Sequence, residues 1–125
     1  MILGIGTDIA RVARFEAAKA RHGERFAERV LGLDELVLYR ERGRPAGYLA
    51  KRFAAKEAFV KALGTGLRRG MRWTDIQVVN DALGRPSLVL SGRALELAEA
   101  EGVRVLHLSL SDESAFAVAF VVLEA

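Results

Sequence analysis

The longest helical pattern in the chain runs from Tyr48 to Leu63 and stops at Gly64-Thr65-Gly66, and it is the feature that constrains the fold most. Glycine is common where helices end, because it adopts the left-handed conformation freely. Apolar residues recur along one side of this segment, at Leu49, Phe53, Val60 and Leu63. We therefore expect an amphipathic helix that packs one side into a core and ends in a glycine-rich turn.

The charged residues of this helix are spaced four apart. Glu57 and Lys61 form one such pair, and Arg52 and Lys56 form a second pair beside it. Residues at this spacing meet on one face of a helix. A carboxylate, several cations and a glycine-rich end in one short segment are suited to holding a metal ion and a polyphosphate. The alternative is a solvated helix face with a Glu–Lys pair, which is common and contributes little to stability.

The first nine residues alternate as a β-strand does. Leu3, Ile5, Thr7 and Ile9 fall on one face, and Ile2, Gly4, Gly6 and Asp8 fall on the other. Two alternate glycines weaken a strand, so we expect some group to approach the backbone closely just before Asp8. Asp8 then either caps the next helix from an edge strand or shares a hard cation with Glu57. Mg²⁺ typically takes one or two protein carboxylates together with phosphates and water.

The remaining segments predict helices first and strands later. Helical patterns cover residues 11–21, 24–31 and 35–42, with Asp34 as the expected cap of the third. After Trp73, strands are expected at 75–79, 87–90, 103–109 and 116–123, with a Ser91-capped helix at 93–101. No repeating βαβ unit is present. We expect one domain over residues 1–125, of the α+β class, with an antiparallel sheet packed by helices.

Charge is spread unevenly along the chain. Residues 1–72 hold 16 Lys and Arg against 8 Asp and Glu, whereas residues 73–125 hold 3 against 8. A basic half favours an anionic partner, which could be a nucleic acid, a phosphorylated ligand or an acidic protein. One Trp and two Tyr argue against base stacking on single-stranded nucleic acid.

Composition excludes several classes of protein. No apolar run reaches the ~18 residues that a membrane-spanning helix needs. The chain has no cysteine, so it has neither a disulfide framework nor thiol chemistry. No serine or histidine lies in a recognisable nucleophile motif, and His107 is expected to be a packed or hydrogen-bonded structural residue. With no targeting segment before the first strand, the expectation is a cytoplasmic protein without a membrane partner.

Five segments together resemble the holo-acyl-carrier-protein synthase family, the small bacterial 4′-phosphopantetheinyl transferases. These segments are Gly4-Ile-Gly-Thr-Asp8, Arg25-Phe-Ala-Glu-Arg-Val-Leu31, Phe53-Ala-Ala-Lys-Glu-Ala58, Lys61-Ala-Leu-Gly-Thr-Gly66 and His107-Leu-Ser-Leu-Ser-Asp112. Each alone is a weak signal, but their order and spacing are specific and cover almost the whole chain. The resemblance implies transfer of 4′-phosphopantetheine from coenzyme A to a serine of apo acyl carrier protein. Adenosine 3′,5′-bisphosphate is released, and the reaction supports fatty acid biosynthesis.

The resemblance also implies roles for individual residues. Asp8 and Glu57 hold Mg²⁺, and Glu57 and Lys61 are catalytic. Coenzyme A is contacted by Arg52, Lys61, Gly64, Thr65 and Gly66, and by Asp112 of a neighbouring subunit in a homotrimer with active sites between subunits. Many family members have His at the position of Asp112, so its role here is open. The acidic carrier protein docks on Arg14, Arg25, Phe26 and Arg29, although a solvated helix face would also explain these arginines.

Two other functions compete with this one. A small basic nucleic-acid-binding domain would use the cations of the first half on phosphates, but it leaves Asp8 and Glu57 unexplained. A non-catalytic binder of coenzyme A or a nucleotide is the third possibility. The general base, either Glu57 or a metal-bound water, and the preferred carrier protein stay open.

Overall fold

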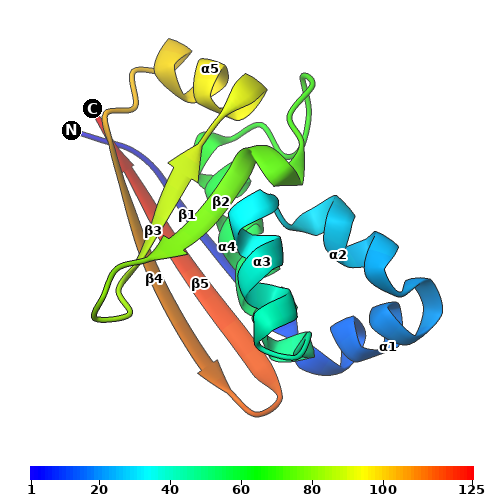
Figure 1. The fold of residues 1–125 in the computed structure, drawn as a ribbon. Coiled ribbons are helices and arrows are strands. Elements are labelled where there is room, and N and C mark those ends of the chain that lie inside the picture. The colour runs from blue at the N-terminus through cyan, green and yellow to red at the C-terminus, as the bar shows by residue number, and fades with distance from the viewer.

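Helices and strands follow one another without a repeating unit in the computed structural model, which describes all residues from 1 to 125 (Figure 1). The elements in chain order are β1 (Ile2–Arg11), α1 (Val12–His22), α2 (Glu24–Val30), α3 (Leu33–Glu41), α4 (Ala46–Leu63), the 3₁₀ turn η1 (Trp73–Asp75), β2 (Ile76–Asn80), β3 (Pro86–Leu90), α5 (Gly92–Ala100), β4 (Val105–Glu113) and β5 (Phe116–Glu124). Every predicted helix and strand is present, with small shifts at the ends.

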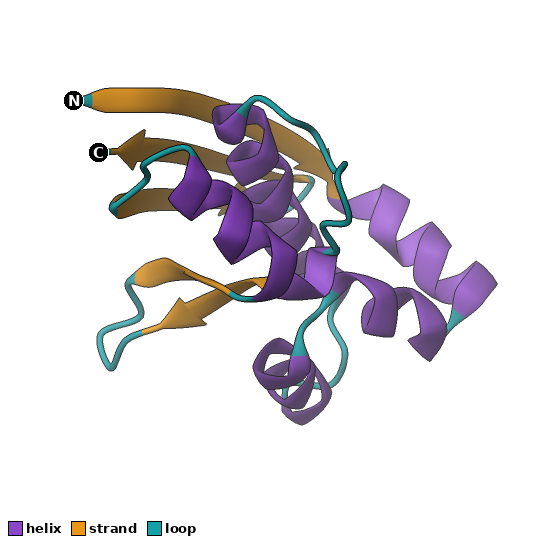
Figure 2. Ribbon diagram, turned by 90° about the horizontal axis from the view of Figure 1, so that it is seen from above, coloured by secondary structure: helices purple, strands orange, loops and turns teal.

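The strands form two antiparallel sheets rather than the single sheet that we expected. The larger sheet has the order β1-β5-β4, so β1 and β4 are its two edges and β5 lies between them. The smaller sheet is the β2–β3 hairpin, which Figure 2 shows set apart from the three long strands. The α+β class is confirmed, and the correction concerns only the number of sheets.

The long helix α4 packs directly on the larger sheet, chiefly over β1 and β5. A side-chain carbon added at Gly4 would lie 1.9 Å from the carbonyl oxygen of Ala62, and one added at Gly6 would lie 1.9 Å from that of Ala58. The group that approaches the strand backbone is therefore α4 itself. The two glycines let the helix settle onto β1, and this brings its charged residues beside Asp8.

The opposite face of the larger sheet is apolar and uncovered. Register across the strands aligns Ile5 with Val122 and His107, and Ile9 with Val118 and Ser111. Exposed apolar side chains on this sheet are Ile2, Leu3, Ile5 and Ile9 of β1, Val105 of β4, and Phe116, Val118 and Phe120 of β5. A face of this kind on a small protein normally meets another molecule.

Three local expectations need correction. Helix α3 begins at Leu33, and Asp34 lies inside its first turn instead of capping it. The backbone N–H of the capping residue Gly32 donates to the Glu35 carboxylate at 2.9 Å. Ser91 occupies the N-cap of α5 but makes no capping hydrogen bond to the helix. Lys56 is not on a solvated face with Arg52, since both side chains are buried.

No helix has both the length and the apolar character needed to cross a bilayer.

Candidate active site

Three of the predicted site residues come together where α4 lies over β1. The Lys61 ammonium donates to Oδ1 of Asp8 at 3.0 Å and to the Thr7 carbonyl oxygen at 3.1 Å. Glu57 lies one helical turn before Lys61 on the same face of α4. Asp8 is largely shielded and Lys61 is half exposed, so the cluster opens to solvent on the Lys61 side.

The two carboxylates of this cluster interact. Partial burial raises the pKa of Glu57 above its ordinary value, and the negative charge of Asp8 raises this pKa further. The cations of Lys61 and Arg14 act on the Glu57 pKa in the opposite direction. Two like charges held close together are relieved by a cation between them.

The donor set fits Mg²⁺. No three acidic or histidine side chains are grouped so that together they could hold a metal ion. A pair of carboxylates is nonetheless what Mg²⁺ usually takes from a protein, because substrate phosphates and water complete its shell. Asp8 and Glu57 are such a pair. The neighbouring Lys61 adds a positive charge that suits a polyphosphate rather than a second metal ion.

The glycine-rich turn follows directly from this cluster. Gly64 ends α4 in the left-handed conformation, with φ of 83°, and its N–H donates to the carbonyl oxygens of Val60 and Lys61. The Thr65 hydroxyl donates to the carbonyl oxygen of Gly66 at 2.8 Å. The turn therefore begins within one helical turn of Lys61.

Arg52 and Asp112 lie in a different place. Both line a pocket of about 490 Å³ between α4, the β2–β3 hairpin and the end of β4. Two further cations, Arg42 and Lys51, line the same pocket, and the Lys51 ammonium is 3.8 Å from Asp112. The three cations Arg42, Lys51 and Arg52 outnumber the two carboxylates that line the pocket, Asp81 and Asp112, so the pocket is suited to an anion. Arg42 and Lys51 were missed in the sequence, where nothing distinguishes them from other surface cations.

The two groups of residues lie apart within a single chain. Asp8 is on β1 and Asp112 is on β4, the two opposite edges of the sheet, with β5 between them. Two strand spacings separate these edges by ~10 Å. Five residues separate Arg52 from Glu57, which places them about 140° apart around α4. The helix body lies between the Asp8 cluster and the Arg52 pocket.

Three of the four predicted partner residues border a hollow between α1 and α2. It is lined by Arg25, Phe26 and Arg29, together with Ala18, Arg21 and His22. The sequence analysis did not predict Arg21 and His22 as part of this surface. Their place in the final turn of α1, just before Arg25, could have indicated it. Arg14 is apart from this hollow: its guanidinium lies 5.4 Å from the centre of the Phe53 ring, close enough to Glu57 to affect its pKa.

His107 lies on the uncovered face of the larger sheet. Its Nε2 is 2.5 Å from a carboxylate oxygen of Glu124, and this contact lowers the pKa of Glu124. The expectation of a hydrogen-bonded histidine is confirmed.

Comparison with known proteins gives a consistent result. Residues 4–121 match the 4′-phosphopantetheinyl transferase superfamily. The holo-[acyl-carrier-protein] synthases of Halorhodospira halophila and Vibrio parahaemolyticus are 57% and 53% identical over 123 residues, which is 98% of each chain compared. The crystal structure of a Neisseria meningitidis holo-[acyl-carrier-protein] synthase superposes with a TM-score of 0.93 at 45% identity, covering all of both chains. A Bacillus anthracis enzyme of the same name, in complex with CoA (3′,5′-ADP), gives 0.83 at 38% identity, covering 100% of this chain and 98% of that one.

Proposed function

The chain belongs to the 4′-phosphopantetheinyl transferase superfamily, and from this premise we propose that it is a Mg²⁺-dependent holo-acyl-carrier-protein synthase. It transfers 4′-phosphopantetheine from coenzyme A to a serine hydroxyl of an apo acyl carrier protein. Adenosine 3′,5′-bisphosphate leaves, and the product serves fatty acid biosynthesis in the cytoplasm. The observation that carries the proposal is the contact of Lys61 with Asp8 beside Glu57, in a chain that matches synthases over almost its whole length.

The chemistry is a phosphoryl-type transfer. The serine oxygen attacks the β-phosphorus of coenzyme A, and the bond from that phosphorus to the bridging oxygen of the pyrophosphate breaks. Asp8 and Glu57 would hold Mg²⁺, which supplies positive charge to the pyrophosphate and orients it when bound. Lys61 neutralises charge that develops on the leaving phosphate. Glu57, or a water molecule beside it, takes the serine proton.

A complete site needs two copies of the chain. The Asp8 cluster is at the β1 edge of the sheet, and the Arg52 and Asp112 pocket is at the β4 edge. In a closed ring of copies, the β1 edge of one can face the β4 edge of the next. The uncovered apolar face, with Ile5, Ile9 and Phe120 exposed, supplies the surface that such an assembly buries. We assign this assembly to a homotrimer, as the family resemblance implies. In the trimer, Arg52 and Asp112 of one subunit contact the coenzyme A that the neighbouring subunit holds.

The carrier protein docks on the basic hollow between α1 and α2. Arg25 and Arg29 suit the acidic surface of a carrier protein, and Phe26 offers an apolar contact between them. A nucleic-acid-binding domain would use the same arginines but would gain nothing from the carboxylate pair of Asp8 and Glu57. Family membership and this pair both favour the transferase.

The test is a transfer assay with purified protein, coenzyme A and apo acyl carrier protein. The carrier protein is followed by intact mass, with Mg²⁺ present or removed by a chelator. We expect addition of one phosphopantetheine only with Mg²⁺, and none to a carrier protein whose acceptor serine is replaced by alanine. A carrier protein that stays apo with Mg²⁺ and coenzyme A in excess would contradict the proposal.

A further inference from the structure

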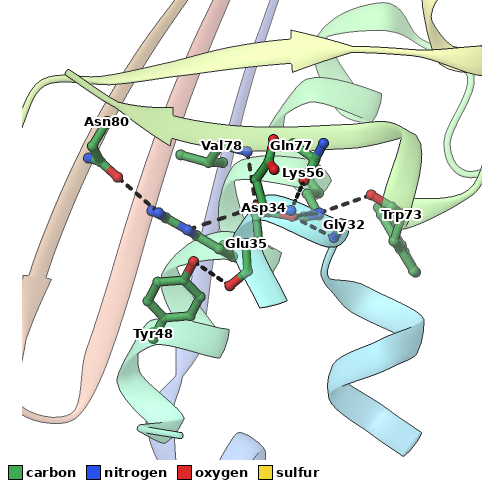
Figure 3. Close-up of polar contacts among 10 residues, drawn as sticks. Gly32, Asp34, Glu35, Tyr48, Lys56, Trp73, Gln77, Val78 and Asn80 are labelled. Carbon is green, nitrogen blue, oxygen red and sulfur yellow. Dashed lines mark hydrogen bonds and ion pairs between the residues drawn. The ribbon is translucent and has the colours of Figure 1, made fainter. Parts of the chain in front are cut away.

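The carboxylate of Glu35, which none of the steps above uses, is fully buried and pairs with an equally buried cation, Lys56. It accepts hydrogen bonds from the Lys56 ammonium at 2.6 Å and from the backbone N–H groups of Gly32 and Val78, each at 2.9 Å (Figure 3). The Lys56 ammonium also donates to the Trp73 carbonyl oxygen at 2.9 Å. Both side chains are fully inaccessible to solvent. Burial lowers the pKa of Lys56, while the Glu35 carboxylate opposes that shift.

Arg52 is the third charge of this network and reaches from it to the pocket. Its Nε lies 3.8 Å from the Glu35 carboxylate, and its guanidinium lies 4.4 Å from the centre of the Tyr48 ring. One terminal nitrogen donates to Oδ1 of Asn80 at 2.9 Å. The Tyr48 hydroxyl in turn donates to the backbone carbonyl oxygen of Glu35 at 2.8 Å. The Tyr48 ring therefore lies on one face of the planar Arg52 guanidinium, and the Glu35 carboxylate lies at its Nε edge. The Asn80 amide oxygen accepts a hydrogen bond from one of its terminal nitrogens.

The placement of Arg52 is not explained by the need to neutralise the buried Glu35 carboxylate. Lys56 already provides Glu35 with a charge partner at 2.6 Å, whereas Arg52 stays at 3.8 Å with its Nε free of any hydrogen bond. Leaving a buried N–H without a partner costs ~1–3 kcal/mol, so another feature must hold this orientation. The same guanidinium lines the anion-suited pocket with Arg42 and Lys51.

We propose that Glu35 and Asn80 are positioning residues that fix the guanidinium of Arg52 at the wall of this pocket, where it receives a phosphate of coenzyme A. This inference rests on the proposed function. Neither residue touches the reacting atoms: Glu35 holds the guanidinium from inside the core, and Asn80 holds its tip from the hairpin. A fixed fork of donors loses less conformational freedom on binding a phosphate than a free arginine does.

The test uses Asn80→Ala, because Asn80 is exposed and its loss leaves the buried pair of Glu35 and Lys56 intact. The variant also removes the hydrogen bond that the Asn80 amide donates to the Gly84 carbonyl oxygen in the hairpin turn. The matched control is Gln77→Ala, three residues earlier on β2, which removes the hydrogen bond from the Asp34 backbone N–H without touching Arg52. For Asn80→Ala we expect KM for coenzyme A to rise about tenfold, with kcat and KM for the carrier protein within twofold of wild type. Coenzyme A binding, measured alone by calorimetry, should weaken by the same factor. Gln77→Ala should match wild type in all four quantities.

Glu35→Gln should weaken coenzyme A binding at least as much as Asn80→Ala, provided that circular dichroism shows that the variant is folded.

Unchanged coenzyme A affinity in Asn80→Ala would overturn the inference, and so would an equal loss in Gln77→Ala, which would mark a general effect of the hairpin. A fall in kcat with KM unchanged would also overturn it, because Arg52 would then act on the transition state alone. The outcome is separable from that of the proposed function. If wild type binds coenzyme A but transfers nothing, the proposed function fails, and the calorimetric comparison still decides whether Asn80 positions Arg52.

Discussion

The ammonium of Lys61 lies 3.0 Å from a carboxylate oxygen of Asp8, although 53 residues separate them along the chain. Lys61 therefore forms its ion pair across the packing of α4 on β1 and not with Glu57 on its own helix. The pair places one cation and two carboxylates at a single opening. A phosphate entering there meets a lysine that is already oriented by Asp8 and by the carbonyl oxygen of Thr7.

Lys61→Ala should lower kcat by ~10²-fold or more, because the lysine meets charge that develops as the pyrophosphate bond breaks. Lys61→Arg should restore only part of this loss, since a planar fork replaces a point charge. Steady-state kinetics with both substrates varied provides the measurement. A change confined to KM for coenzyme A would show that Lys61 binds only the ground state.

Gly6→Ala should lower the free energy of unfolding by about 3 kcal/mol or more, because its methyl group would collide with a backbone oxygen of α4. Gly47→Ala is the matched control, since a side-chain carbon there meets nothing within 4 Å. In the first turn of α4 it should be neutral or stabilise by up to about 1 kcal/mol. Chemical denaturation measures both changes. A Gly6→Ala protein as stable as the control would refute the close packing of α4 on β1.

The Glu57 carboxyl should make the metal-free protein less stable as pH rises. Its raised pKa means that the folded state holds this proton more tightly than the unfolded state does. Stability from Glu57 is therefore fully present below its ordinary pKa of about 4.3 and is lost as pH rises through the folded pKa. Melting temperatures of wild type and Glu57→Gln, measured with a chelator, report this effect, because titratable groups that do not interact with Glu57 contribute equally to both proteins.

Wild type should lose stability relative to Glu57→Gln across that range of pH, and Mg²⁺ should restore wild type but not the variant at neutral pH. A constant difference between the two proteins would mean that neither burial nor the charge of Asp8 raises the pKa of Glu57. Stabilisation of both proteins by Mg²⁺ to the same extent would place the ion elsewhere.

Charge reversal should separate the two roles of the basic helices. Arg25→Glu should raise KM for the carrier protein several-fold and leave coenzyme A binding unchanged, and added salt should weaken carrier binding by wild type. Arg14→Glu should also impair the reaction itself, because Arg14 acts on the pKa of Glu57. Arg104→Glu, an exposed arginine distant in sequence from both, is the control. If Arg25→Glu behaves like Arg104→Glu, the hollow between α1 and α2 is not the docking surface.

The sequence was sufficient for much of the fold and for the first half of the site. The sequence pattern predicted every α-helix and strand, although not the 3₁₀ turn η1, and the spacing of Glu57 and Lys61 placed both on one face of α4. The alternate glycines at Gly4 and Gly6 predicted a close approach, but only the three-dimensional packing identifies α4 as the approaching group.

Long-range partners could not be predicted in the same way. Glu35 looks like a first-turn residue of an ordinary helix, and Lys56 looks like a solvated cation. Their burial depends on how α3, α4 and β2 meet, and no local pattern encodes this. The same limit applies to Arg52 and Asp112, whose separation from Asp8 follows from the strand order β1-β5-β4.

The most direct test of the account mixes two inactive variants, Asp8→Ala and Arg52→Ala, which damage opposite edges of the sheet. Each variant is checked for folding and assembly, and the two are unfolded, refolded together and purified as mixed oligomers carrying different tags. Phosphopantetheine transfer to apo carrier protein is then measured beside each parent. The account predicts that both parents are impaired and that the mixture regains activity, because an intact Asp8 cluster of one subunit meets an intact Arg52 pocket of another. Verified mixed oligomers with no more activity than their parents would contradict it.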